Sequence, residues 1–228
     1  MLPILLTFWP FMETVIKKNK KYLGNCAVDV EEKVQRNILS SLNAVGTIIL
    51  IIIYLNTQNN LIFTATILYP VIFYIYDTYY LWFNSNKKNN SFTYIIHHLT
   101  AIYLIQCIYL YNGNLRTTIL IVLLCIELSN LPLYYVYHFL KTNNEKNIKF
   151  YERLLLLKKL QLGIYGFLRI VISGIFFNKY FDYIKHMPIF TSSFVLIFCM
   201  SSIWIYHQFN GYFKTKKEYN DFLIKNLT

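Results

Sequence analysis

Ionisable residues within apolar stretches are the part of this sequence that can do chemistry. Asp77, Glu127 and Arg169 each lie in such a stretch, and the adjacent His97 and His98 begin another. A charge in hydrocarbon is costly unless it is paired or faces a wet cavity, so such residues often mark a functional site. Histidine can take a proton or carry an acyl group near neutral pH, and a carboxylate on its other ring nitrogen fixes its tautomer. The residue types therefore predict a histidine and carboxylate site for proton transfer.

Four of these residues are predicted to lie at one depth. Neighbouring antiparallel helices rise equally per residue, so reflecting the chain about each polar joint compares depths. This reflection carries position 77 onto 98, 98 onto 127, and 127 onto 167, which is close to Arg169. We expect Asp77, His98, Glu127 and Arg169 to face one polar chamber roughly 10 Å from the cytosolic boundary. In it, His98 would act as base or nucleophile and His97 as its partner, while Asp77 and Glu127 would orient the imidazole rings.

Other polar and aromatic side chains within the apolar stretches are expected to bind the substrate. They are Arg169, Asn43, Asn130, Tyr80, Tyr134, Trp204 and His207. An alternative is that the polar groups only hold helices together, because interhelical polar contacts are common in membranes. Four ionisable groups at one depth favour a functional site, because each must also recover its desolvation cost.

The composition is that of a membrane protein. Hydrophobic residues make up 56% of the 228 residues and charged residues only 14%, whereas a soluble domain has roughly a quarter charged residues. The 18% aromatic residues and the small number of Gly and Pro exclude a disordered or collagen-like chain. The formal charge of +11 is explained by basic residues that flank apolar stretches, so we expect no nucleic-acid partner.

Six apolar stretches are each long enough to cross a membrane as a helix. They are Asn37 to Leu55, Leu61 to Phe83, Phe92 to Tyr111, Arg116 to Leu140, Leu160 to Asn178 and Pro188 to Tyr212. The sequence therefore predicts an all-α, multi-pass transmembrane bundle of about six spans around a central polar chamber. Residues 1–36 would form a basic N-terminal segment with a short apolar anchor, residues 37–213 the membrane domain, and residues 214–228 a basic tail. We expect Leu2 to Phe11 to be an interfacial or re-entrant anchor rather than a full span.

The basic residues predict the orientation of the bundle. Eighteen Lys and Arg residues fall on one side of the predicted spans and three on the other. By the positive-inside rule, both termini are expected to be cytosolic. Of the four cysteines, Cys107, Cys125 and Cys199 lie in apolar stretches without metal-ligand spacing, so we expect neither a metal nor a disulfide.

Three stretches of this sequence resemble the TLC-domain family, the polytopic membrane proteins that include the ceramide synthases. They are YDTYYLWF, YIIHHLTAIYLI and LLCIELSNLPLYYVYHFLK, and the similarity extends from RNILSSLNA to SIWIYHQFNGYFK. The chain is more similar to the short TLC proteins than to ceramide synthases. Ile126, Glu127 and Asn130 stand where ceramide synthases have His, Asp and Asp, and Asn43 stands where many relatives have histidine.

The resemblance implies a role in lipid metabolism, with membrane lipids as partners, in the endoplasmic reticulum or another endomembrane. The expected reaction is acyl transfer from acyl-CoA, as co-substrate, to a lipid amine or hydroxyl, with no other cofactor. Four lysines beside the spans are expected to contact the acyl-CoA phosphates, namely Lys87, Lys88, Lys158 and Lys159. One alternative is a non-catalytic protein that binds or transports lipid, or regulates membrane composition, with the same chamber. Proton-coupled transport is a further alternative function. Among partners, a second copy of the chain in a homodimer is left as an alternative.

Overall fold

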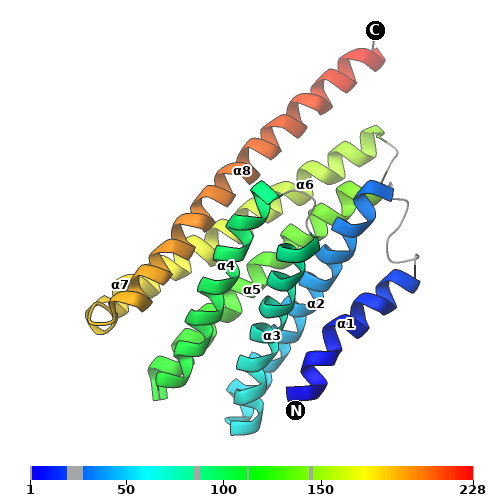
Figure 1. Cartoon of the computed structure of the whole chain (residues 1–228). Helices are drawn as coiled ribbons and strands as arrows, with labels where there is room; N and C mark the ends of the chain where they lie inside the picture. The colour runs from blue at the N-terminus through cyan, green and yellow to red at the C-terminus, as the bar shows by residue number, and fades with distance from the viewer. Residues whose placement is uncertain (1, 20–27, 85–87, 112, 144–145, 228) are drawn as a thin grey trace.

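The computed structural model describes residues 2–19, 28–84, 88–111, 113–143 and 146–227, and no strand occurs among them (Figure 1). Its elements, in chain order, are α1 (Leu2–Lys18), α2 (Val28–Thr57), α3 (Asn60–Asn84), α4 (Lys88–Cys107), η2 (Ile108–Leu110), α5 (Gly113–Thr142), α6 (Ile148–Tyr165), η3 (Gly166–Val171), α7 (Ile172–Ile184) and α8 (Pro188–Leu227). Element η2 is a turn of 3-10 helix that ends α4, and η3 is a π-helical segment between α6 and α7.

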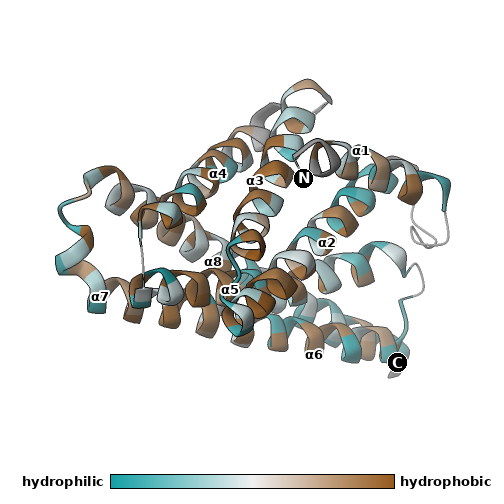
Figure 2. Cartoon of the chain, turned by 90° about the horizontal axis from the view of Figure 1, so that it is seen from below, coloured by the Kyte–Doolittle hydropathy of each residue, from teal (hydrophilic) through white to brown (hydrophobic). Residues whose placement is uncertain are grey.

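Six helical segments are long and apolar enough to cross a membrane. They are Val30–Thr57, Asn60–Phe83, Phe92–Leu110, Gly113–Thr142, Ile148–Ile184 and Pro188–Asn226. Figure 2 shows hydrophobic residues along the lengths of the helices and hydrophilic residues mainly near their ends and in the connections. The prediction of an all-α, multi-pass membrane bundle is confirmed.

The six spans pack as a closed ring. Going around it, α2 packs against α3, α3 against α4, α4 against α8, α8 against α6 and η3, α6 against α5, and α5 back against α2 (Figure 1). The contact between α2 and α5 joins parts of the chain that are far apart in sequence. In a ring of this kind, one face of every span points toward a common centre and away from lipid. Polar residues on these faces therefore avoid the hydrocarbon.

Several helices extend beyond the predicted spans. Helix α2 begins at Val28, α6 begins at Ile148 and α8 continues to Leu227, so the expected boundaries at residues 37 and 213 fall inside helices. The extension of α6 has a packing cause: Phe150 and Leu154 belong to a buried cluster that also contacts Tyr219 and Phe222 of α8. The long fourth joint and the basic tail are thus largely helical, because their apolar residues cover one another.

Helix α1 lies along α2 and α3. Trp9 is fully buried, with its ring centroid 5.2 Å from that of Tyr69 and 4.7 Å from that of Phe73. The helix is continuous over its 17 residues and does not double back. Helix α1 is therefore a short helix packed against the side of the bundle.

Candidate functional site

Asp77 of α3 is the centre of one buried polar cluster. Its Oδ1 atom lies 2.6 Å from Nη2 of Arg36 on α2, and its Oδ2 atom lies 3.6 Å from Nε2 of His98 on α4. The Nδ1 atom of His98 is 3.3 Å from the hydroxyl of Thr78. The separation of 3.6 Å exceeds that of a hydrogen bond, so His98 is positioned beside the carboxylate without being directly bonded to it.

Glu127 of α5 is the centre of a second cluster. Its carboxylate accepts hydrogen bonds from the hydroxyl of Tyr74, at 3.1 Å, and from Nδ2 of Asn130, at 3.3 Å. Oδ1 of Asn130 in turn accepts from Nη1 of Arg169 at 3.2 Å, and the same nitrogen donates to the Tyr165 hydroxyl at 2.9 Å. An asparagine suits this bridging position because its amide offers a donor to the glutamate and an acceptor to the arginine, whereas an aspartate would oppose Glu127.

Tyr74 connects the two clusters. Its hydroxyl donates to Glu127, and its ring centroid lies 5.0 Å from that of His98. Asp77, His98, Glu127 and Arg169 are all at least nine-tenths buried. The structure therefore brings the four predicted residues into one polar layer, arranged as two linked clusters.

Arg169 is presented to the centre of the bundle by η3. The six residues Gly166–Val171 form a π-helix within an otherwise α-helical span, and such segments are frequent at functional sites. Its guanidinium carbon lies 5.1 Å from the ring centroid of Tyr165 and 5.9 Å from that of Trp204. A Cβ atom at Gly166 would come within 3.0 Å of Ile205, so the glycine permits a close approach between η3 and α8.

A cavity of about 70 Å³ opens beside the second cluster, which is enough volume for a few water molecules. Its polar lining consists of His97, Glu127, Arg169, Ser173 and Ser201. The remaining lining is largely apolar and consists of Tyr74, Ala101, Leu104, Ile105, Leu123, Ile126, Phe194, Ile197 and Phe198. Leu104 and Ile105 lie about two turns beyond His97 on α4, and Phe194 lies two turns before Ser201 on α8. The cavity is therefore amphipathic, with a polar end and an apolar end.

His97, and not His98, is the histidine that lines this cavity. Its ring centroid lies 4.9 Å from that of Trp204 and 5.8 Å from that of His98. The Nδ1 atom of His97 is buried and has no hydrogen-bond partner among the described residues. The structure thus differs from the sequence-based expectation for the two histidines: His98 lies between Asp77 and Thr78, while His97 lines the cavity.

The remaining residues that were predicted to bind the substrate have different surroundings. Asn43 is 2% exposed and its Oδ1 atom has no partner among the described residues, and Tyr134 receives a hydrogen bond from Asn37 on its backbone carbonyl at 2.9 Å. Tyr80 bonds to Glu32 of α2. His207 is exposed on α8 and does not line the cavity.

The lysines expected to contact acyl-CoA have different surroundings. Nζ of Lys158 donates to the backbone carbonyl of Gly211 and to the hydroxyl of Thr215, each at 2.7 Å, so it ties α6 to α8. Lys159 is exposed. Lys87 and the side chain of Lys88 lie outside the described residues. Lys158 is thus already engaged within the protein, and Lys159 is the described lysine of this set with an open side chain.

Two residues of the polar clusters, Arg36 and Tyr74, are not among the predicted site residues. Arg36 precedes Asn43 by seven residues and shares its helical face, but its position beside the first span predicts a basic flank rather than a site residue. Tyr74 resembled the many other tyrosines of the spans. Among the described residues, no group of three His, Cys, Asp or Glu side chains is arranged to hold a metal ion.

No protein-family model, curated protein or solved structure matches this chain.

Proposed function

We propose that this chain is an integral membrane protein of lipid metabolism that transfers an acyl group from acyl-CoA to the amine or hydroxyl of a lipid. The observation that carries the proposal is His97, which lines an amphipathic cavity together with Arg169 and Glu127 and whose buried Nδ1 atom has no hydrogen-bond partner among the described residues. The apolar end of the cavity suits part of an acyl chain, and the polar end suits the reacting carbonyl. The resemblance to TLC-domain proteins supports the same substrate class and an endoplasmic reticulum location, with residues 37–213 as the TLC-like domain.

The proposed step is proton-coupled acyl transfer. The imidazole of His97 takes the proton of the acceptor N–H or O–H while the acceptor lone pair forms a bond to the thioester carbonyl carbon. The C–S bond then breaks, and the departing thiolate takes the proton from the imidazolium. Arg169 is placed to stabilise negative charge on the carbonyl oxygen. Tyr74 and Asn130 hold Glu127 next to this group, and Glu127 balances the charge of Arg169.

The proposal predicts that His97→Ala abolishes acyl transfer. The assay is the lipid composition of cells that express the wild type or a variant, together with turnover of labelled acyl-CoA by the purified protein. His186→Ala is a matched control, because His186 is an exposed histidine at the end of α7. Full turnover by His97→Ala would remove the catalytic assignment, as would an equal loss in the control.

A second function is non-catalytic lipid binding in the same chamber. It is favoured because both carboxylates already have partners within the protein. Arg36 donates a hydrogen bond to Asp77, and Tyr74 and Asn130 donate hydrogen bonds to Glu127. In that case Arg169 matters most, because a guanidinium holds a phosphate well. Arg169→Gln would then abolish lipid co-purification, whereas His97→Ala would leave it unchanged and neither protein would turn over acyl-CoA.

A further inference from the structure

A second cavity lies between α1, α2 and α3, apart from the chamber. It has a volume of about 400 Å³. Its lining residues are Glu13, Lys17, Glu32, Tyr76, Tyr79 and Tyr80. None of these side chains lines the cavity beside His97, so this pocket is available to a different ligand.

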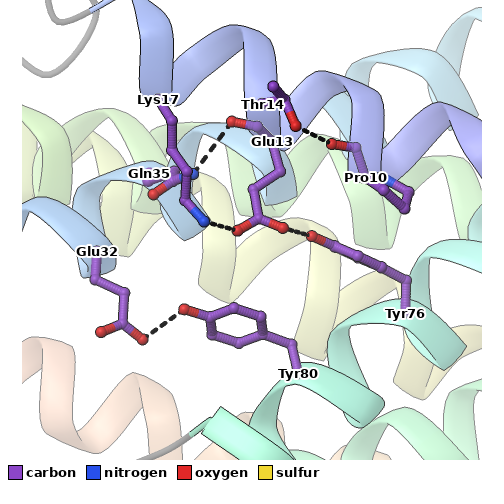
Figure 3. A network of polar contacts seen from close by, with 8 residues as sticks. All are labelled: Pro10, Glu13, Thr14, Lys17, Glu32, Gln35, Tyr76 and Tyr80. Atoms are coloured by element: carbon purple, nitrogen blue, oxygen red, sulfur yellow. Dashed lines mark hydrogen bonds and ion pairs between the residues drawn. The ribbon is translucent and has the colours of Figure 1, made fainter.

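Hydrogen bonds between helices build the walls of the pocket (Figure 3). Tyr76 of α3 donates to the carboxylate of Glu13 on α1, and Tyr80 donates to Glu32 of α2 at 2.6 Å. Glu13 also accepts from Lys17, and its backbone carbonyl accepts from Nε2 of Gln35 at 3.3 Å. Both carboxylates are therefore held in place by phenol groups from the same face of α3.

The pocket has the chemistry of an ammonium site. Tyr79 and Tyr80 follow Tyr76 at helical spacings of three and four, so each of them is a neighbour of Tyr76 on the helix surface. Two glutamates and one lysine give the lining a net negative charge within a chain whose formal charge is +11. Aromatic faces combined with carboxylates are the groups that recognise quaternary and primary ammonium ions.

Two neighbours support this interpretation. The guanidinium carbon of Arg36 lies 4.9 Å from the ring centroid of Tyr80, so one ring of this set already binds a cation of the protein, and the ligand ammonium is assigned to Tyr76 and Tyr79. Lys17 has a side chain that is 57% exposed, which leaves its ammonium group accessible at the rim. A negatively charged group that is covalently linked to the bound ammonium would meet this lysine.

We propose that the pocket binds the headgroup of a zwitterionic phospholipid, with the ammonium group against Tyr76, Tyr79 and the glutamates and the phosphate at Lys17. A lipid is preferred to a soluble ammonium compound because Tyr79 and Phe83 extend the pocket as an exposed aromatic edge. They are 61% and 66% exposed, with ring centroids 4.6 Å apart. Exposed aromatic residues near the end of a transmembrane helix are typical of the boundary between headgroups and acyl chains.

Binding of two lipids with identical acyl chains tests the proposal. The purified full chain in detergent is titrated with dioleoyl phosphatidylcholine or with dioleoyl phosphatidylglycerol, which lacks an ammonium group, and bound lipid is counted by native mass spectrometry. We expect phosphatidylcholine to bind more tightly. Glu32→Gln and Tyr79→Leu should each weaken its binding roughly three- to tenfold, without changing the binding of phosphatidylglycerol.

Glu152→Gln is the matched control. Glu152 of α6 accepts a hydrogen bond from Tyr219 of α8 at 3.3 Å, so the substitution changes the same type of tyrosine and glutamate pair outside the pocket and should leave lipid binding unchanged. Because Glu32 and Tyr79 are exposed, the variants are expected to fold, and thermal unfolding verifies this.

Equal affinity for the two lipids, or wild-type binding by both variants, would overturn the proposal. Soluble phosphocholine that displaces the lipid at equal concentration would overturn the assignment to a lipid. The readout is binding and not turnover, so failure here is distinguishable from failure of the acyl-transfer proposal.

Discussion

At the scale of single residues, the ion pair of Arg36 and Asp77 offers a direct test of the polar layer. The side chain of Asp77 is 10% exposed and that of Arg36 is 25% exposed. Arg36→Met leaves the carboxylate without its guanidinium, and we expect a loss of about 2 kcal/mol, below the value for a fully buried pair because Arg36 is partly exposed. Thermal unfolding in detergent measures the effect.

Asp77→Asn should cost less, because the amide still accepts a hydrogen bond and needs no counter-charge. The double substitution should then resemble Asp77→Asn alone, since the two residues share one interaction. Lys185→Met is the control: it breaks an exposed pair with Asp182, 2.7 Å apart, and should leave the melting temperature unchanged. Additive losses in the double variant would contradict the pairing.

Membership of the polar layer was predictable from the sequence, but the direction of each side chain was not. Equal helical rise places Asp77, His98, Glu127 and Arg169 level, and the structure joins them through Tyr74 and Asn130. Adjacent residues on a helix point about 100° apart, so either His97 or His98 could face the cavity. The choice depends on the packing of α4 against α8, where Trp204 contacts His97, and that tertiary contact leaves no local signal.

At the scale of helices, Gly46 controls how closely α2 approaches α3. A Cβ atom at this position would lie 2.6 Å from the Cε1 and Cζ atoms of Tyr69, which is too close. Tyr69 packs on Trp9 of α1 and donates to the backbone carbonyl of Leu42 at 3.3 Å. Gly46→Ala should therefore displace the ring and destabilise the junction of the three helices by roughly 1 to 3 kcal/mol.

Gly174→Ala provides the comparison, measured by the same thermal unfolding. Nothing lies within 4 Å of a Cβ atom built at Gly174 in α7, so alanine should stabilise the helix by roughly 0.5 to 1 kcal/mol through its lower conformational entropy. If both variants melted at the same temperature, the close approach at Gly46 would be excluded.

The spans themselves were predictable because hydropathy and length decide whether a helix can cross a bilayer. The extensions of α6 and α8 were not, because their helical structure depends on a cluster formed by residues far apart in sequence, among them Phe139, Phe150 and Phe222. The π-helical turn η3 was equally hidden, since a single inserted residue changes neither composition nor hydropathy.

At the scale of the whole molecule, the closed ring of spans explains why the chamber can be polar. Each span contributes one inward face, and the hydrogen bonds of Glu127, Asn130 and Arg169 link α3, α5, α6 and η3 across the centre. The outer faces carry exposed apolar residues such as Ile49, Leu128 and Ile203, as a lipid environment requires. Polar groups are thus satisfied internally while the surface matches the bilayer.

The orientation of this ring in the membrane is the remaining prediction. The charge count predicts a cytosolic C-terminus and cytosolic basic joints, and it also predicts a cytosolic N-terminus. The course of α1 favours a different position for the N-terminus. Its Lys17 and Lys18 lie at the end that leads into α2, and its 17 helical residues extend about 25 Å, which is most of a hydrocarbon core of about 30 Å.

We therefore expect a glycosylation sequon added before residue 1 to be modified in microsomes, and one added after residue 228 to remain unmodified. A sequon inserted at Gln58, in the connection between α2 and α3, is the positive control, because the charge count places that connection opposite the basic joints. If the control is glycosylated and the N-terminal sequon is not, α1 does not carry the N-terminus across the membrane, and the charge count is right for both termini. If both are glycosylated, α1 crosses, because a helix that does not double back can carry its first residue to the far surface only by passing through the bilayer.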